Sequence, residues 1–202
     1  MIKLFEQYND YNQVKDWLDE MEVLNYTIND DLTVDVDGDV DMGYKRLTEI
    51  PVQFGVVKGD FDINNNKLTS LKGCPNRVEN SFFCNRNELT SLEGGPMYVD
   101  NYYKCSANKL TTLKGSPEYV GGDFACGSNR LTSTQYAPKH IGRHFQSYDN
   151  NYPDELTSFR DPKILVMLLK HQEEYGLWNT NGSLNKGRWD LFMKDYEAGI
   201  LN

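Results

Sequence analysis

The chain has 202 residues, enough for one domain with a continuous core, and its 30 acidic residues outnumber its 21 basic residues, giving a net charge of −9. This balance argues against direct nucleic-acid binding, which requires a positive surface opposite the phosphates. The first residues lack the basic and apolar segments of a signal peptide, and no segment approaches the ~20 apolar residues of a membrane-spanning helix. We therefore expect a cytoplasmic protein that binds no membrane.

The first predicted element is a helix that covers the start of the fold. Asp10 or Asn12 can cap its N-terminus, and the helix is expected to end near Leu24. Its apolar residues recur at helical spacing: Val14, Trp17, Leu18 and Met21. Because the end of a repeat stack would otherwise expose its core to water, we assign residues 1–33 to an N-terminal helical cap.

A 21-residue repeat follows the predicted helix. Leucines recur with this spacing at Leu47, Leu68, Leu89, Leu110 and Leu131. Large apolar residues form a second column: Val40, Phe61, Phe82, Tyr103, Phe124 and Phe145. Two residues after each of these comes a smaller one: Met42, Ile63, Cys84, Cys105, Cys126 and Ser147. The two-residue spacing is typical of a strand with one buried face, so residues 34–160 predict a parallel-sheet solenoid of about six coils, with one strand in each coil.

Other repeated residues are interpreted as scaffold. An asparagine column is expected to point inward and to satisfy backbone groups of its own turn and of the neighbouring coil: Asn66, Asn87, Asn108, Asn129 and Asn150. Two further columns are expected at bends with positive φ, one comprising Gly73, Gly94 and Gly115, the other Gly38, Gly59, Asn80, Asn101 and Gly122. The column that contains Cys84 is interpreted as small core residues, and Cys74 as a partly exposed thiol.

The pattern Pro-x-x-Val followed by Phe-x-Cys-x-x-Asn-x-Leu-Thr-Ser-Leu resembles the short leucine-rich repeats of secreted bacterial effectors, and it is more similar still to bacteriophage leucine-rich-repeat proteins. In that group a stretch like residues 17–40 precedes repeats like residues 121–131, and the resemblance covers roughly residues 14–150. It implies a leucine-rich-repeat fold, a viral or prophage origin and a protein-binding role. It implies no reaction and no catalytic residue, and we expect no enzyme activity.

The C-terminal residues 161–202 are predicted to form a helical cap. An apolar run, residues 164–169, follows Pro162 and predicts a buried helix that extends to about Tyr175 and ends at Gly176. A second helix is expected after Asn185. Its apolar face would be formed by Trp189, Phe192, Met193 and Tyr196.

Candidate binding residues are those between the inward columns, because a strand that points Phe61 and Ile63 inward must point its other side chains outward, onto the concave face of the solenoid. The middle and last coils place aromatic and basic residues there, a composition typical of binding hot spots: Phe83, Arg86, Tyr102, Lys104, His144 and Tyr148. The first coils carry an acidic strip instead: Asp39, Asp41, Asp60 and Asp62.

These surfaces predict a protein-binding module that engages a protein of the bacterial host and inhibits a defence or regulatory system. One alternative is an acidic nucleic-acid mimic that uses the acidic strip. Another is an enzyme with a site in the C-terminal helices, around His171, Glu173, Glu174 and Trp178. Self-association of the solenoid also remains open. No metal or cofactor site is predicted, because residues 35–46 lack the final Glu of a calcium loop and the cysteines lack the spacing of zinc sites.

Overall fold

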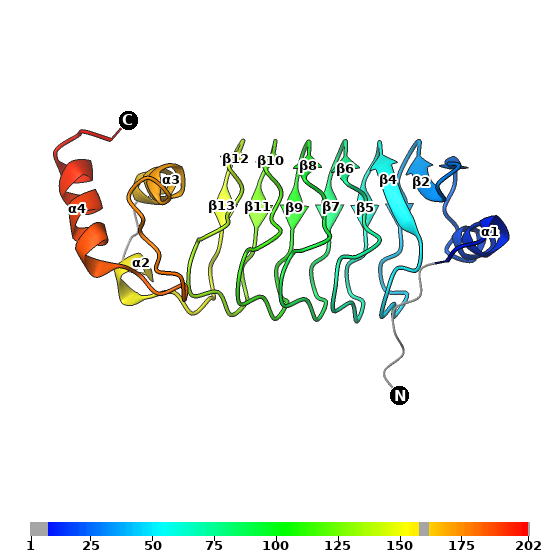
Figure 1. The fold of residues 1–202 in the computed structure, drawn as a ribbon, viewed down its shortest axis with the longest axis horizontal. Helices are drawn as coiled ribbons and strands as arrows, with labels where there is room; N and C mark the ends of the chain where they lie inside the picture. The colour runs from blue at the N-terminus through cyan, green and yellow to red at the C-terminus, as the bar shows by residue number, and fades with distance from the viewer. Residues whose placement is uncertain (1–7, 158–161, 202) are drawn as a thin grey trace.

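A computed structural model describes residues 8–157 and 162–201 of the chain. The described residues form a β-solenoid with helices at both ends, as predicted (Figure 1). Helix α1 is the N-terminal helix, and α2, α3 and α4 follow the last coil. Their bounds are Tyr11–Glu20, Asp154–Thr157, Pro162–His171 and Lys186–Glu197. None of these helices has the length and apolar character that a membrane crossing requires.

Each coil contributes two short strands, whereas the repeat predicted one. Sheet A contains β1 (Tyr26–Ile28), β2 (Thr33–Val36), β4 (Gln53–Val57), β6 (Arg77–Val78), β8 (Tyr98–Val99), β10 (Tyr119–Val120) and β12 (His140–Ile141). Sheet B contains β3 (Val40–Asp41), β5 (Phe61–Asp62), β7 (Phe82–Phe83), β9 (Tyr103–Lys104), β11 (Phe124–Ala125) and β13 (Phe145–Gln146). The prediction missed sheet A because its short strands carry one repeated inward residue, for example Val78, with polar residues such as Asn76 and Asn80 two positions away, so no alternating apolar pattern marks them.

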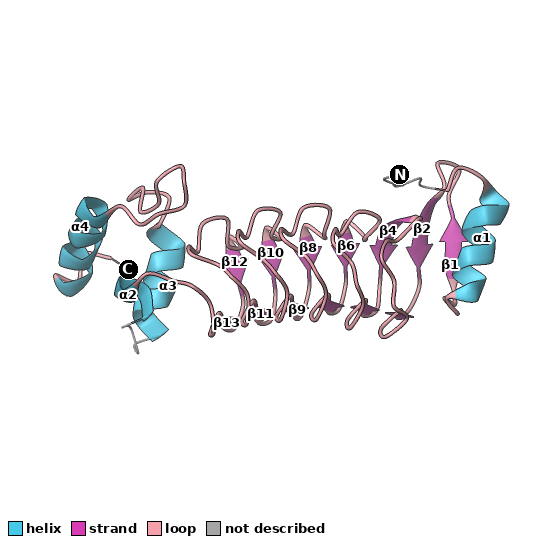
Figure 2. Ribbon diagram, turned by 90° about the horizontal axis from the view of Figure 1, so that it is seen from below, coloured by secondary structure: helices cyan, strands magenta, loops and turns pink. Residues whose placement is uncertain are grey.

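Successive coils stack in parallel with a 21-residue register throughout sheet B, for example Phe61 beside Phe82 and Phe82 beside Tyr103. In sheet A the same register holds from β4 onward, and the pairing of β2 with β4 contains a register shift between Val34 and Val36. Among the strands of sheets A and B in the described residues, β1 alone runs antiparallel, to β2, and closes the N-terminal end of sheet A. The inward aromatic column is confirmed as a ladder whose neighbouring ring centroids lie 5.1–5.8 Å apart from Phe61 to Phe145. The coils form a nearly straight row in two perpendicular views, so the face expected to be concave is nearly flat (Figures 1 and 2).

The asparagine column has the structural role that the sequence predicted. The Asn87 amide donates to the carbonyls of Ile63 (2.9 Å) and Cys84 (3.2 Å), and its oxygen accepts from the backbone N–H of Leu68 (3.0 Å). Asn66 and Asn129 repeat this arrangement in their own coils. Each amide therefore links adjacent coils where the backbone turns away from the ladder.

The bends follow the prediction in one column and not in the other. Gly73, Gly94 and Gly115 have φ of 85–91°, as expected. In the column of Gly38, only Gly38 has a positive φ among the described residues, so this prediction is wrong for the rest. The left-handed residues lie instead just before the asparagine column, with φ of 54–60°: Tyr44, Asn65, Arg86, Ala107, Ser128 and Asp149.

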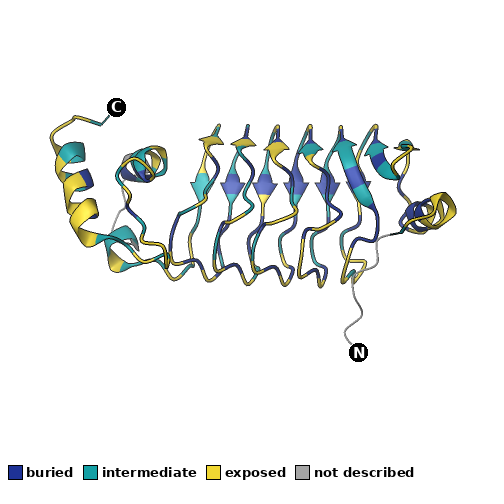
Figure 3. Ribbon diagram, in the orientation of Figure 1, coloured by how far each residue is buried: buried dark blue, intermediate teal, exposed yellow. Residues whose placement is uncertain are grey.

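The two helical ends differ in how they meet the solenoid. The Asp10 carboxylate caps α1 by accepting from the N–H of Asn12 (2.8 Å), and Trp17 and Leu18 pack into the solenoid core, which confirms the N-terminal cap. Buried residues then recur in each coil from β2 to β11 (Figure 3). The C-terminal helices have a separate apolar cluster centred on Leu168 and Phe192.

Helix α3 departs from its prediction in two respects. It ends at His171, followed by a turn in which Gly176 has a φ of 59°, so it is shorter than expected. It is also amphipathic, because Val166 is 59% exposed within the run that was expected to be buried. The boundary predicted at residue 160 lies outside the described residues.

Candidate functional site

The candidate surface is the outward face of sheet B, where one side chain from each coil stands beside its neighbour in the next strand. The strand register sets their order as Asp41, Asp62, Phe83, Lys104, Ala125 and Gln146. Phe83 therefore lies between a carboxylate on one side and an ammonium on the other. Its side chain is half-buried, and that of Lys104 is exposed.

A groove of about 500 Å³ follows the ends of the sheet B strands. It brings together four of the six predicted hot-spot residues, Phe83, Arg86, Lys104 and Tyr148, together with Asp62 of the acidic strip. The rest of its lining is mostly small or polar: Tyr44, Asn64, Asn65, Asn85, Ser106, Ala107 and Ser128. We call this surface the sheet B groove.

Exposed tyrosines from the first and last coils bound the sheet B groove. Tyr44 is 71% exposed and Tyr148 is 66% exposed. A Cβ atom built on Gly127 would come within 3.0 Å of the Tyr148 ring, so the ring lies directly on the glycine backbone. The glycine therefore permits a position of Tyr148 that a larger residue would disturb.

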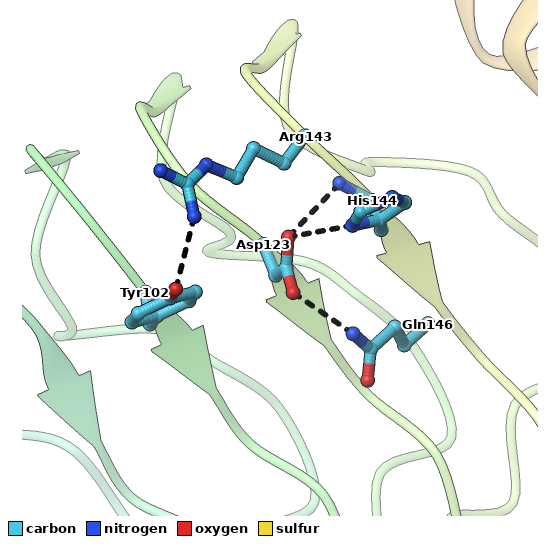
Figure 4. Close-up of polar contacts among 5 residues, drawn as sticks. All are labelled: Tyr102, Asp123, Arg143, His144 and Gln146. Atoms are coloured by element: carbon cyan, nitrogen blue, oxygen red, sulfur yellow. Dashed lines mark hydrogen bonds and ion pairs between the residues drawn. The ribbon is translucent and has the colours of Figure 1, made fainter.

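The other two predicted hot-spot residues belong to a second cluster, at the opposite ends of the strands (Figure 4). The Arg143 guanidinium donates to the Tyr102 hydroxyl at 3.0 Å and lies 5.9 Å from the centre of the Tyr102 ring. The Asp123 carboxylate contacts His144 Nδ1 at 3.0 Å and accepts from Gln146 Nε2 at 3.0 Å. The six predicted residues thus form two sites, because Tyr102 and His144 precede their strands whereas Arg86 and Tyr148 follow theirs.

Much of the acidic strip serves the backbone. The Asp39 carboxylate accepts from the N–H of Asp60 (2.7 Å), and the Asp60 carboxylate accepts from the N–H of Ser81 (2.9 Å), so each joins its coil to the next. Asp62 accepts from both the backbone and the side-chain amide of Asn64. Burial, and to a lesser degree the charge of Asp41, raises the pKa of Asp62.

Sequence reasoning missed an outward column on sheet A. Strand register places Arg77, Tyr98, Tyr119 and His140 side by side, and the Tyr119 and His140 rings stack with centroids 4.6 Å apart and an interplanar angle of 2°. Tyr98 and Tyr119 are 40% and 38% exposed. The 21-residue repeat contains the signal, since these residues immediately precede a further repeated apolar column, Val78, Val99, Val120 and Ile141, which was not identified as a strand.

The cysteines are core residues. All four lie among the described residues and are buried, including Cys74 at 2% exposure, so the expectation of a partly exposed Cys74 thiol is wrong. Burial raises the pKa of Cys126 to about 12 and raises those of the other three thiols as well. Thiols with raised pKa values are poor nucleophiles. Within the described residues, no group of three or more metal-ligating side chains is arranged to hold a metal ion.

The residues of the suggested C-terminal enzyme site have separate partners. His171 Nδ1 lies 2.9 Å from the Glu174 carboxylate, while the Trp178 indole N–H donates to Gln172 Oε1 at 2.8 Å. Glu173 lines a different feature, a groove of about 310 Å³ between α3 and the last coil. Gln172 Oε1 also accepts from the Thr134 hydroxyl at 2.8 Å, so this region joins the helices to the solenoid.

Comparison with known proteins assigns the chain to no family: no family model, no curated protein and no solved structure matches it. The resemblance to bacteriophage leucine-rich-repeat proteins therefore stays a prediction from the sequence. The outward face of sheet B, above all the groove that contains Phe83 and Lys104, is the candidate functional surface.

Proposed function

We propose that the chain is a protein-binding module whose partner contacts the outward face of sheet B. The observation that supports it is the sheet B groove, where Phe83, Arg86, Lys104 and Tyr148 line one depression. Aromatic and arginine side chains are enriched in the energetic centres of protein interfaces. In this proposal the chain is encoded by a bacteriophage or prophage, and its partner is a host protein in the bacterial cytoplasm that belongs to a defence or regulatory system.

The acidic mimic has weaker support. A mimic of nucleic acid would present its carboxylates to the partner, but those of Asp39 and Asp60 accept backbone hydrogen bonds within the solenoid. One oxygen of each carboxylate is thus engaged within the solenoid, which leaves only the other for a partner. The aromatic and basic side chains of the groove, by contrast, line its open space together.

Affinity capture from a bacterial host lysate, followed by mass spectrometry, tests the proposal. The double variant Phe83→Ala/Tyr148→Ala should retain a partner on the order of tenfold less than the unaltered chain, since truncation of hot-spot aromatics removes most of the contact energy. Tyr98→Ala/Tyr119→Ala on sheet A is the matched control and should retain the partner. Equal retention by both double variants would contradict a site on sheet B.

Tyr102→Ala separates the two clusters on sheet B. Because Tyr102 contacts Arg143 and lies outside the groove lining, this change should leave capture nearly unchanged while Phe83→Ala weakens it. Melting temperatures close to that of the unaltered chain would show that the variants are folded. If Tyr102→Ala were the more damaging change, the binding site would be the cluster around Asp123 and not the groove.

A further inference from the structure

The two cations of the sheet B groove have no carboxylate at the neighbouring positions of the adjacent coils, although Asp62 lines the same groove two coils before Lys104. In the strand register Lys104 has Phe83 and Ala125 as its neighbours. In the turns, the residues one coil before and one coil after Arg86 are Asn65 and Ala107. Among the described residues, neither Arg86 nor Lys104 forms an ion pair. Two positive charges are thus left without a counterion in a chain whose net charge is −9.

Several other lysines of the solenoid are paired by the repeat itself. Four of them each contact a carboxylate one coil earlier, at N–O distances of 2.9–3.3 Å: Lys58 with Asp37, Lys109 with Glu88, Lys114 with Glu93 and Lys139 with Glu118. The same geometry was available to Lys104 and Arg86, but the preceding coil places an aromatic ring and an amide there. The groove therefore offers its charges to an external anion.

The shape of the groove indicates an extended ligand. It reaches from Tyr44 in the first coil to Tyr148 in the sixth, and five steps of ~4.8 Å between stacked strands give roughly 24 Å. A chain that rises ~3.3 Å per residue covers this length with about seven residues. Asn85 and Ser106 lie between the two ends and can exchange hydrogen bonds with a peptide backbone.

We propose that the sheet B groove binds an extended acidic peptide segment of the partner protein, with carboxylates beside Arg86 and Lys104 and an apolar side chain against Phe83. This inference rests on the proposed function and specifies the chemistry of the partner. A phosphate backbone would also be attracted to the two cations, but Asp62 in the same groove and Asp41 beside it repel a continuous polyanion. A peptide can place its charges only where the cations lie.

The test is a selection of random displayed peptides, long enough to span the groove, against the immobilised full chain. The unaltered chain should enrich sequences with Asp or Glu at central positions. The charge reversal Arg86→Glu/Lys104→Glu should bind those peptides on the order of tenfold more weakly by fluorescence anisotropy and should enrich Lys and Arg instead. The control Lys67→Glu/Arg130→Glu makes the same change in net charge outside the groove lining and should keep the acidic preference.

Selected peptides without an acidic preference, or an unchanged motif after the charge reversal, would overturn the inference. If Phe83→Ala/Tyr148→Ala still abolished their binding, the proposed protein-binding surface would stand and only the acidic partner would fail. If neither groove double variant affected binding, both proposals would fail. Labelled oligothymidylate, added as a separate probe, should not bind; binding that the charge reversal removes would identify a nucleic-acid ligand in place of the peptide.

Discussion

Asp41 and Asp62 stand side by side on β3 and β5, with both carboxylates on the outward side of sheet B. Like charges directly opposite each other in a sheet are destabilising. Each carboxylate accepts a backbone N–H two residues further on, from Gly43 and Asn64 respectively, and these bonds hold the two side chains near each other. The hydrogen bonds within each turn are thus made, although they bring two negative charges together.

The pairing predicts a pH-dependent effect of Asp41→Asn. Because the pKa of Asp62 is raised, its contribution to stability is complete below the ordinary aspartate pKa of about 4 and is lost as the pH rises through the raised value. Asparagine keeps the acceptor for Gly43 and removes the like charge, so urea unfolding at neutral pH should show a gain of less than about 1 kcal/mol. In acid the gain should vanish. An equal gain at both pH values would refute the coupling, and Asp37→Asn, which loses the pair with Lys58, should show no gain.

Ala107 occupies the left-handed column with a φ of 56° and is exposed. Because residues with a Cβ are strained in this region, Ala107→Gly should raise the free energy of unfolding by roughly 1 kcal/mol. The control is Ala125→Gly in β11, where the backbone is extended and glycine should destabilise by about 0.5–1 kcal/mol. Chemical denaturation of both variants measures the two changes in the free energy of unfolding, which should be opposite in sign. A loss of stability in both would show that the positive φ of Ala107 does not strain the folded chain.

The Asn87 side chain satisfies three buried backbone groups, so Asn87→Ala should lower the free energy of unfolding by about 3 kcal/mol. Asn76→Ala, at an exposed position directly before β6, should change it by less than about 0.5 kcal/mol. Thermal and urea unfolding measure both. A small effect at Asn87 would mean that the neighbouring coils reform these hydrogen bonds without the amide.

Gln172 connects the solenoid to the C-terminal helices, since its Oε1 accepts from Thr134 and from Trp178. Gln172→Leu leaves two donors without their partner, and should speed hydrogen exchange in α3 and α4 by the equivalent of about 2 kcal/mol. Exchange in β7 and β9 should be unchanged, because the helices have their own apolar cluster. Glu173→Leu, at the next and exposed position, serves as the control. Parallel acceleration throughout the chain would show instead that both parts unfold together.

Much of this architecture could be predicted because the repeat shows the same pattern of inward and outward side chains in every coil. The two-residue spacing of Phe82 and Cys84 defines which side of the backbone is inward, and the 21-residue period repeats it in every coil. The capping of α1 by Asp10 was predictable for a similar reason, since it depends on neighbouring residues in the chain.

The sequence by itself therefore determined the solenoid, its aromatic ladder, its asparagine column and the outward position of Phe83 and Lys104. Tertiary structure alone decided that each coil has a second strand, that the coils stack in a nearly straight row, and that Tyr102 and His144 lie apart from Arg86 and Tyr148. It also decided the separate core of the C-terminal helices. The physical reason is that side-chain direction within a coil is a local property, whereas the neighbours of a side chain depend on where the backbone bends and on how the coils stack.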